Sequence, residues 1–345
     1  MPSGPAVSVV VVSWNGAHLL PDCLDSLLAQ TVADRLEVVV LDNASADGTA
    51  ELLAERYPTV RRVAAPRNLG FAGGVALALD AGLRGDFLAL VNNDATLAPD
   101  ALERLLATLS DPANARVAAA TARVHLAPRP GTPAGATAVV NSTGNLVTRR
   151  GRGLDRDWQR SSADRLGGPD VFGFYGGAAL LRLSAVREVG GMDAGLFLYY
   201  EDTDLSWRLR AAGWSVRYVD DAVAVHRHAA SSVVDSPLFR YYNTRNSLVV
   251  FARHAPARVV VGSLLRQTGG GVRAAIAAGP RDAAVRARFR GLAAWWLRLP
   301  RTLAERRRIW SGSAVSRREV ARYLDRDVPR DPRGAQGAQD GPAGA

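Results

Sequence analysis

Apolar runs alternate with helical patterns along the N-terminal third of the chain. Residues 7–13, VSVVVVS, form a continuous β-branched run, which is typical of a strand buried on both faces of a parallel sheet. Strands that are each followed by a helix predict βαβ units, and therefore an α/β fold with a mostly parallel sheet flanked by helices. Further strands are expected at 36–45, 60–65 and 87–94, and helices at 19–30, 50–56, 74–83 and 98–109.

The pattern is less regular after this point. Residues 123–170 are rich in Gly, Pro, Arg and Thr, which predicts loops and short strands. Regular elements are expected again as a strand and helix at 174–193, a helix at 199–214, and a strand pair at 215–228 that ends on His226 and His228.

Positive charge is concentrated at the C-terminal end. The net charge is +10, yet residues 1–252 carry 24 Arg against 26 acidic residues, while residues 253–345 carry 19 Arg against 7. We therefore expect one α/β domain over 1–252 and a basic C-terminal appendage. The domain should divide into two halves, at about 7–122 and 123–252. The appendage should consist of an Arg- and Trp-rich helical region at 253–328 and a disordered tail at 329–345.

Three interpretations of the basic region remain open. It suits an amphipathic helix on an anionic membrane leaflet, a nucleic-acid-binding segment, or a solvated tail. Trp295 and Trp296 lie beside Leu292, Leu297 and Leu299, which favours the membrane interface. The slightly negative first 252 residues speak against nucleic acid.

Cysteine content and hydropathy point to the cytoplasm. Cys23 is the only cysteine, so an intrachain disulfide is excluded and a reducing compartment fits. The N-terminal apolar run is too short for a signal-peptide core, and the chain has no stretch of about 18 apolar residues. We expect a cytoplasmic protein that is at most peripheral on the inner face of the membrane.

Two carboxylates end predicted strands. Asp42 and Asp94 would face one crevice, because ligands of such sheets bind outside the carboxyl ends of the strands. A Mg²⁺ or Mn²⁺ ion that carries a diphosphate needs only one or two protein carboxylates. Turn chemistry explains Asp42 equally well, and for Asp94, in an isolated Asn-Asn-Asp, it is the favoured interpretation.

Other polar motifs also have two interpretations. The glycines of residues 67–82 do not match the dinucleotide fingerprint, although such a turn can present N–H groups to a phosphate. The acids Glu201, Asp202 and Asp204 suit a helix N-terminus, and one of them could instead be a general base. His226 would be a metal ligand only if its strand reaches Asp94.

Seven stretches in order resemble the inverting family-2 glycosyltransferases, which have a GT-A fold, and among them the rhamnosyltransferase-like subgroup. The resemblance covers roughly residues 7–250. The stretches are VSVVVVSWN, VVVLDNASADGT, RNLGFAGG, LVNNDATLAPD, FYGGAALLRLSAVREVGGMD, FLYYEDTDLSWRLRAAGW and VAVHRHAASS.

The resemblance implies roles for individual residues. Asp202 matches the catalytic base of the family, and Glu201 stands beside it. Asp94 matches the last acid of the family's D-x-D metal motif. His226 matches a histidine that completes the metal site in some relatives. The implied cofactor is a divalent metal, Mg²⁺ or Mn²⁺. The implied donor contacts are Ser13, Trp14, Asn15, Asp42, Asn43, Asn68, Gly70, Asn93 and Asp94, and the implied acceptor contacts are Gly176, Gly177 and Trp207.

The sequence departs from the family pattern at three points. The first acid of D-x-D is Asn92, and Val12 replaces the usual polar residue before SWN. The Q-x-x-R-W motif of processive synthases is absent, and YYNTRN at 241–246 stands in that region. The last difference predicts an enzyme that adds a single sugar.

The resemblance therefore predicts an inverting, metal-dependent glycosyltransferase. The implied partners are a nucleotide-diphosphate sugar such as dTDP-rhamnose or a UDP-hexose, a glycan or polyprenyl-linked acceptor of cell-envelope polysaccharide synthesis, and an anionic membrane surface bound by the C-terminal region. Two alternatives are a sugar nucleotidyltransferase, which would release pyrophosphate, and a non-catalytic membrane or nucleic-acid adaptor.

Overall fold

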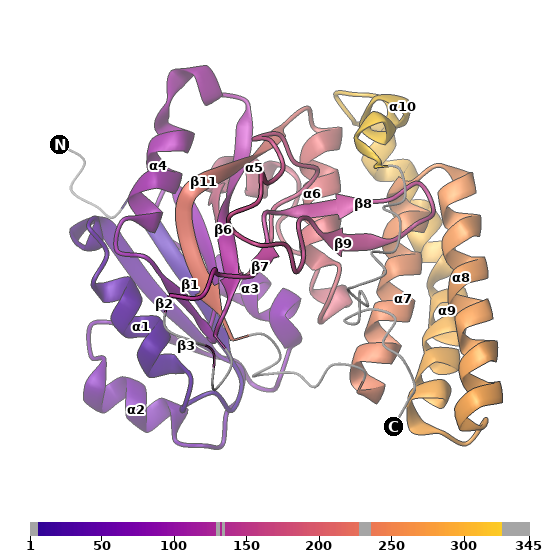
Figure 1. Cartoon of the computed structure of the whole chain (residues 1–345), viewed down its shortest axis with the longest axis horizontal. Helices are drawn as coiled ribbons and strands as arrows, with labels where there is room; N and C mark the ends of the chain where they lie inside the picture. The colour runs from indigo at the N-terminus through magenta and orange to yellow at the C-terminus, as the bar shows by residue number, and fades with distance from the viewer. Residues whose placement is uncertain (1–5, 129–131, 133–134, 228–235, 326–345) are drawn as a thin grey trace. The chain divides into compact units, whose positions relative to one another are not determined.

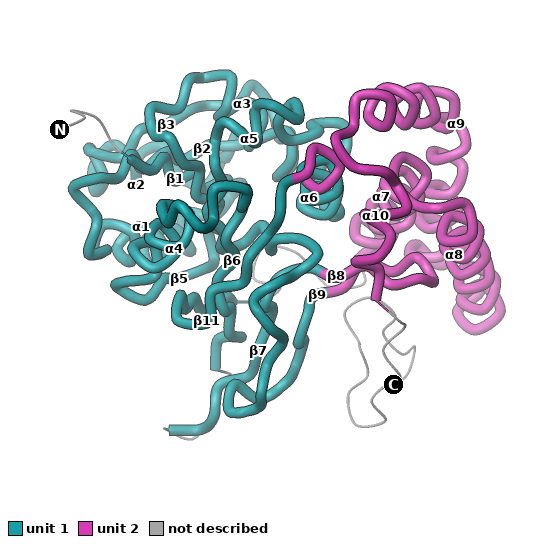
Figure 2. Tube along the Cα trace, turned by 90° about the horizontal axis from the view of Figure 1, so that it is seen from above, with its two compact units in different colours: residues 1–145, 155–209, 214–231 teal, residues 146–154, 210–213, 232–345 magenta. Residues whose placement is uncertain are grey.

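A computed structural model describes residues 6–128, 132, 135–227 and 236–325, and the chain forms two compact units. Unit 1 comprises residues 1–145, 155–209 and 214–231 (Figure 2). Unit 2 comprises residues 146–154, 210–213 and 232–345. The expected domain boundary at residue 252 lies inside a helix of unit 2, and the tail expected at 329–345 and His228 lie outside the described residues.

Unit 1 is built on a nine-stranded sheet in the order β3-β2-β1-β4-β10-β6-β11-β5, with β7 paired to β6 (Figure 1). Strands β3, β2, β1 and β4 are parallel, and the antiparallel β10 connects them to β6 and β11, which are parallel to each other. The strands are β1 Val7–Ser13, β2 Leu36–Asp42, β3 Arg61–Ala64, β4 Phe87–Asn92, β5 Ala95–Leu97, β6 Val117–Leu126, β7 Val140–Ser142, β10 Ala178–Arg182 and β11 Ser215–His226.

Helices cover both faces of this sheet. Val9 and Val11 of β1 belong to one core with Leu24, Leu27 and other residues of α1, α2 and α4. On the opposite face, Gly74 of α3 lies so close to Val12 that an added Cβ would come within 2.8 Å of its side chain. The continuous apolar run is explained by burial on both faces. The helices of unit 1 are α1 Leu20–Leu28, α2 Thr49–Arg56, α3 Gly70–Asp80, α4 Ala101–Ser110, α5 Leu183–Glu188 and α6 Glu201–Ala211, the last of which ends in unit 2.

Two expected elements differ from the structure. Residues 215–226 form one long strand, and the strand pair expected at 215–228 was wrong, because a bulge between Val219 and Val223 lets a single strand follow β6 past Asp220 and Asp221. Helix α3 begins at Gly70, four residues before its expected start, because the Asn68 Oδ1 accepts the Gly70 N–H and starts the helix.

Unit 2 is mainly helical. Gly291 lets α9 approach α7 closely, since a Cβ there would lie 2.7 Å from the Tyr241 carbonyl oxygen. Arg253 pairs with Glu305 at 2.7 Å between the same helices. Among the described residues, no helix has the length and apolar content that a membrane crossing requires. The helices are α7 Pro237–His254, α8 Ala257–Ala278, α9 Ala283–Ser311 and α10 Arg317–Val320; the short strands β8 Asn145–Val147 and β9 Gly153–Asp155 pair with each other.

Candidate active site

The carboxyl ends of β1, β2 and β4 meet at one edge of the sheet. Ser13 is in register with Asp42, and Val12 is in register with Asn92. The Asn93 amide donates to Ser13 Oγ at 3.2 Å, which joins the segment after β4 to the end of β1. The predicted donor residues of three separate segments are therefore brought together at this edge.

The loops that follow β1 and β2 are tied to each other. The backbone N–H of Asn15 donates to Ser45 Oγ at 3.0 Å, and the Asn15 side-chain oxygen accepts the Ala46 N–H at 2.9 Å. Asn15 adopts a φ of 51°, which the asparagine side chain tolerates. The neighbouring Trp14 ring is 53% exposed, so it is accessible to a flat ligand at this edge.

Asp42 is buried and already paired. Its Oδ2 accepts from Arg62 Nε at 3.0 Å and from Arg62 Nη2 at 2.7 Å, and its Oδ1 accepts the Ser45 N–H at 2.9 Å. If the nucleobase of a nucleotide-sugar donor bound Asp42, it would share this carboxylate with Arg62. Sequence reasoning missed Arg62, which lies on β3 in a segment without a recognisable motif.

Asn43, Asn68 and Gly70 form a braced turn. The Asn43 amide donates to the Gly70 carbonyl at 3.0 Å, and the Asn43 side-chain oxygen accepts the Leu69 N–H at 3.0 Å. Gly70 has a φ of +70°, and a Cβ there would lie 2.2 Å from the Phe197 carbonyl oxygen. Glycine is therefore required at this position, and the Asn43 side chain holds the turn.

Asp94 and His226 lie together, as the metal interpretation requires. Asp94 Oδ1 is 3.1 Å from His226 Nε2, and both side chains are buried. Asn92, which stands where the family has its first acid, places its amide nitrogen 3.3 Å from the same Nε2. On the other side of the ring, Asn141 Oδ1 is 2.8 Å from His226 Nδ1.

This arrangement suits a cation. The Asn141 oxygen can only accept a hydrogen bond, so it favours a proton on His226 Nδ1 and leaves Nε2 with a lone pair. This lone pair can accept from the Asn92 amide, and a cation beside it would also be attracted by the Asp94 carboxylate at 3.1 Å. Within the described ranges no group of three or more His, Cys, Asp or Glu side chains is arranged to hold a metal. A divalent ion here would therefore take further ligands from a bound diphosphate and water.

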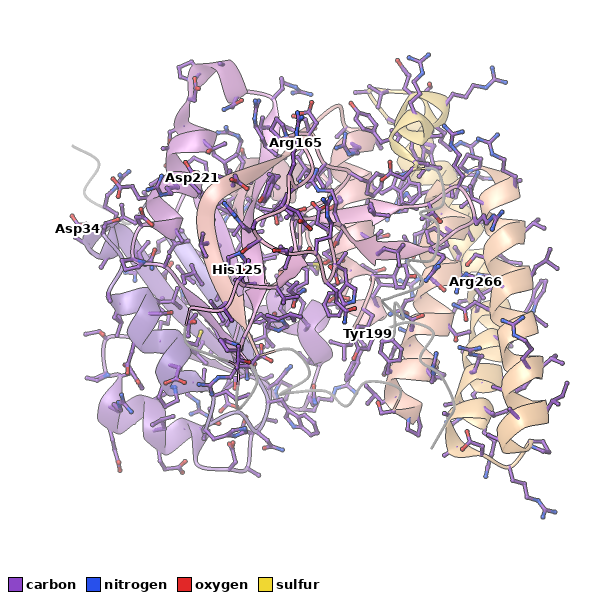
Figure 3. The ribbon with its side chains drawn as sticks, in the orientation of Figure 1. Asp34, His125, Arg165, Tyr199, Asp221 and Arg266 are labelled. Atoms are coloured by element: carbon purple, nitrogen blue, oxygen red, sulfur yellow. The ribbon has the colours of Figure 1, made fainter. Side chains whose placement is uncertain are left out.

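Asp202 lies at the start of α6, directly after a strained turn. Tyr199 and Tyr200 have φ values of 69° and 70°, and Tyr199 is labelled in Figure 3. Asp202 Oδ2 accepts the Gly176 N–H at 3.2 Å, and Asp202 Oδ1 accepts the Thr203 N–H at 2.6 Å. Burial raises the pKa of Asp202 above its ordinary value, against the opposing effect of these hydrogen bonds and one from Asn145.

Glu201 is buried next to Asp202. Burial, followed by the charge of Asp202, raises the pKa of Glu201 well above its ordinary value. Its Oε2 has no hydrogen-bond partner within the part of the chain that the structure describes. A protonated Glu201 could donate a hydrogen bond to a group bound beside it, which Asp202 as a carboxylate could not.

Three consecutive residues connect the Asp94–His226 pair to Asp202. The Tyr175 hydroxyl lies 3.3 Å from His226 Nδ1, and the Gly176 N–H donates to Asp202. The Gly177 carbonyl accepts the Asn92 N–H at 3.0 Å, and a Cβ at Gly177 would lie 2.9 Å from the Asn92 amide nitrogen. Gly177 therefore lets the backbone approach Asn92 closely. Tyr175 is a site residue to which sequence reasoning assigned no role.

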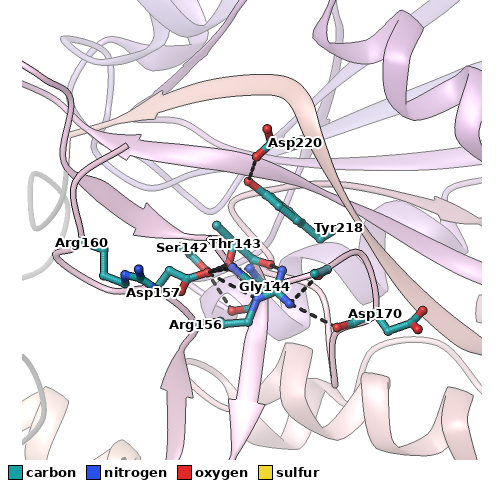
Figure 4. A network of polar contacts seen from close by, with 11 residues as sticks. Ser142, Thr143, Gly144, Arg156, Asp157, Arg160, Asp170, Tyr218 and Asp220 are labelled. Carbon is teal, nitrogen blue, oxygen red and sulfur yellow. Dashed lines mark hydrogen bonds and ion pairs between the residues drawn. The ribbon is translucent and has the colours of Figure 1, made fainter. Parts of the chain in front are cut away.

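A second segment, the turn between Asn141 and Asn145, also contacts both groups. Asn141 binds His226, and the Asn145 side chain hydrogen-bonds Asp202. Arg156 holds the turn, because its guanidinium donates to Thr143 Oγ1 at 2.7 Å and to the Thr143 carbonyl at 3.0 Å (Figure 4). Sequence reasoning assigned 123–170 to loops and short strands, and nothing in its composition marks these residues.

Trp207 does not reach the surface of unit 1. Its side chain is 1% exposed and packs edge-on against Phe172, with ring centroids 5.1 Å apart. The ring is part of the interior, so its predicted contact with an acceptor is not available in this structure.

Comparison with known proteins identifies the family. The model of glycosyl transferase family 2 matches residues 8–190. The chain belongs to glycosyl transferase family 2. This glycosyltransferase is also 31% identical over 244 residues to the N-acetylglucosaminyl-diphospho-decaprenol L-rhamnosyltransferase of Mycobacterium tuberculosis, a match that covers 65% of this chain and 76% of the relative. The succinoglycan biosynthesis protein ExoO of Rhizobium meliloti is 38% identical over 115 residues, which are 33% of this chain and 32% of that protein.

Solved structures show that the glycosyltransferase has a GT-A fold. The mannosyltransferase PcManGT from Pyrobaculum calidifontis, in complex with GDP-Man and Mn²⁺, matches with a TM-score of 0.52 and 20% identity, over 90% of this chain and 89% of that chain. GalNAc-T7 with UDP, GalNAc and Mn²⁺ matches with a TM-score of 0.60 and 15% identity, over 78% of this chain and 51% of that chain.

The glycosyltransferase carries one further carboxyl group near its predicted base. Burial, and then the charge of Asp202, raises the pKa of Asp155 to about 7, and a hydrogen bond with Ser142 opposes the increase. A carboxyl group whose pKa is raised by folding stabilises the protein most below its unfolded pKa. That contribution is lost as the pH rises through about 7, the folded pKa.

We expect Asp155→Asn to raise the midpoint of thermal unfolding relative to the wild-type protein at about pH 8.5, and to have roughly half that effect at about pH 5.5. The amide does not titrate, so it removes a cost that grows from the unfolded pKa, where the unfolded carboxyl group ionises, up to the folded pKa of about 7. The measurement is thermal unfolding followed by circular dichroism at both pH values. Asp34→Asn, at an exposed residue, is the matched control. An equal increase at both pH values would contradict the titration of Asp155.

Proposed function

We propose that this glycosyltransferase catalyses inverting transfer of a sugar from a nucleotide-diphosphate donor to a hydroxyl group of a glycan or polyprenyl-linked acceptor. The donor is dTDP-rhamnose or a UDP-hexose, and the product belongs to cell-envelope polysaccharide synthesis. The observation that carries the proposal is that two adjacent residues, Tyr175 and Gly176, contact His226 of the Asp94–His226 pair and the Asp202 carboxylate, respectively. The name of the mycobacterial relative supports the donor and acceptor classes.

Asp202 is the base in this reaction. An acceptor hydroxyl group bound beside Asp202 transfers its proton to the carboxylate as its oxygen attacks the anomeric carbon. The raised pKa of Asp202 makes the carboxylate a stronger base than an exposed aspartate. Attack from the face opposite the leaving diphosphate inverts the anomeric centre in one displacement. Glu201, when protonated, orients the acceptor by a hydrogen bond.

Asp94 and His226 are the residues that would hold Mg²⁺ or Mn²⁺. Such an ion, when bound, supplies positive charge that stabilises the diphosphate as it leaves. The chain contributes the orientation of the imidazole through Asn141 and a buried carboxylate at hydrogen-bond distance from Nε2. The two similar structures, both solved with Mn²⁺, support a divalent ion in this role.

The crevice at the ends of β1, β2 and β4 would hold the nucleotide. Trp14 offers an exposed ring for stacking, and the Asp42–Arg62 pair offers both an acceptor and donors to a base. The segments around Ser13, Asn15 and Asn93 line the same edge. The enzyme would act in the cytoplasm, on the inner face of the membrane where a polyprenyl-linked acceptor is accessible.

The test is donor binding followed by product analysis. Thermal unfolding of the full chain is measured with a panel of nucleotide-diphosphate sugars, with and without Mn²⁺, and we expect stabilisation by one donor class that increases with the metal. Incubation of that donor with lipid-linked acceptors should then release a nucleoside diphosphate and an inverted glycoside. Release of pyrophosphate would instead indicate a nucleotidyltransferase, and a retained anomeric configuration would exclude the in-line displacement by the acceptor.

A further inference from the structure

Helix α8 of unit 2 has four large apolar side chains on its exposed face. Its buried residues are Val259, Ser263, Gln267 and Gly271, of which three are polar or lack a side chain. Its large exposed residues are Val261, Leu265, Val272 and Ile276. Leu265 and Ile276 are 68% and 80% exposed. This is the reverse of the pattern of an ordinary surface helix, which buries its apolar side.

The exposed residues lie along one side of the helix, in two pairs that Thr268 and Gly269 separate. Their spacings of four, seven and four residues place them within an arc of about 60° on an α-helix, opposite the buried face. The buried face is fixed by specific contacts, so the helix cannot simply rotate. Gln267 accepts from the Thr244 hydroxyl at 3.3 Å and donates to Ser247 Oγ at 3.1 Å, both on α7. We call the four residues Val261, Leu265, Val272 and Ile276 the α8 stripe.

Basic residues accompany the α8 stripe. Residues 257–311 contain 12 Arg and only two acidic residues, Asp282 and Glu305. In α8 itself, Arg258 and Arg273 are exposed. Arg266, labelled in Figure 3, instead donates to the Gly151 carbonyl at 2.9 Å and so helps to hold unit 2 together. An apolar surface in such a positive environment is complementary to a surface that offers both hydrocarbon and negative charge.

The neighbouring helix α9 exposes an aromatic residue of the kind found at lipid headgroups. Trp296 is 55% exposed and Leu297 is 85% exposed, whereas Trp295 and Leu292 are buried. Of the two tryptophans that the sequence marks as candidates for a membrane interface, only Trp296 is accessible. An indole ring at the surface and aliphatic side chains beside arginines suit the boundary between headgroups and acyl chains.

We propose that the α8 stripe inserts into the headgroup region of an anionic lipid bilayer, with the arginines of α8 and α9 at the phosphate level. The helix would lie in the plane of the surface. The choice of lipid over other partners rests on the proposed function, in which the acceptor is polyprenyl-linked, and on the net positive charge beside the stripe. A nucleic acid would engage the arginines but would leave four large aliphatic side chains in water.

The test is co-sedimentation of the full chain with vesicles of phosphatidylglycerol and phosphatidylcholine, and with vesicles of phosphatidylcholine alone. We expect binding to the anionic vesicles that decreases as salt is added, and weak binding to the neutral ones. The double substitution Leu265→Ser and Ile276→Ser should weaken partitioning to anionic vesicles by at least about tenfold, because it removes two inserting side chains. Both residues are largely exposed, so folding should be retained, and circular dichroism checks this.

Leu28→Ser is the matched control, since Leu28 is an exposed leucine of α1 in unit 1. It should leave vesicle binding unchanged. Equal sedimentation of the double variant and the wild-type protein would overturn the proposal, as would the absence of wild-type binding. A wild-type dimer in light scattering that the double variant abolishes, without vesicle binding, would assign the stripe to a second copy of the chain.

A parallel donor-binding measurement separates this proposal from the proposed function. Thermal stabilisation by the nucleotide sugar depends on unit 1 and should be the same in the double variant. Donor binding without vesicle binding would contradict only the role of the stripe. Vesicle binding without any donor binding would contradict only the transferase function.

Discussion

Replacing Asp202 with asparagine is expected to lower the rate of sugar transfer by about 10²- to 10⁴-fold, the usual contribution of a general base. The amide keeps the size of the side chain and can still accept from the Gly176 N–H, but it cannot take the acceptor proton. The Asp94–His226 pair does not involve Asp202, so the thermal stabilisation produced by donor and Mn²⁺ should persist. Initial rates of nucleoside diphosphate release measure the first effect, and thermal unfolding measures the second.

Asp221→Asn is the control for this experiment. Asp221, labelled in Figure 3, is largely exposed on β11 and pairs with Arg104 at 3.3 Å. Its loss should change neither rate nor donor binding. Wild-type turnover in the Asp202 variant would remove Asp202 from its proposed role. Loss of both turnover and donor binding would instead indicate that Asp202 supports the fold of the site.

Replacing Asp94 with asparagine is expected to abolish the part of donor binding that depends on the metal. The amide retains one neutral oxygen but removes the charge that a divalent ion needs beside the His226 imidazole. Changes in the outer shell of metal sites already cost 10- to 100-fold, so we expect a loss in apparent Mn²⁺ affinity of at least about 100-fold for a direct ligand. The measurement is a Mn²⁺ titration of donor-induced thermal stabilisation.

A substitution at Asn92 is expected to have the opposite effect on Mn²⁺ affinity. Its amide nitrogen lies 3.3 Å from His226 Nε2, so Asn92→Asp would place a second carboxylate at the same site. This variant should reach half-maximal stabilisation at a lower Mn²⁺ concentration than the wild-type protein. A metal response that is unchanged in the Asp94 variant would show that the ion, if one is used, is held elsewhere.

The sequence pattern predicted the part of the site at the sheet edge, because the end of a strand can be recognised from neighbouring residues alone. Residues 7–13 are mostly valine, and the strand there is buried on both faces, as expected. Asp42 and Asp94 follow such strands, and the topology brings their ends to one edge without further information. The proximity of His226 to Asp94 could not be predicted in this way, because it depends on the antiparallel pairing of β11 with β5, in which His226 is in register with Ala95, a residue far from it in sequence.

The residues that orient the site could not be predicted in the same way. Asn141 and Asn145 act through a turn whose shape depends on Arg156, and no periodicity marks that turn. The pairing of Asp42 with Arg62 likewise depends on the register of β2 with β3. The sequence also could not show which tryptophan is exposed, because Trp295 and Trp296 differ only in which side of α9 they occupy.

The turn at 141–145 has a consequence for any attempt to redesign this enzyme. Its first residue contacts the His226 imidazole, and its last residue hydrogen-bonds the Asp202 carboxylate. Thr143 lies between them, and Arg156 anchors it at two atoms. Under the proposed function, we therefore expect substitutions within the turn to change acceptor preference and metal response together, whereas substitutions around Trp14 should alter donor choice alone.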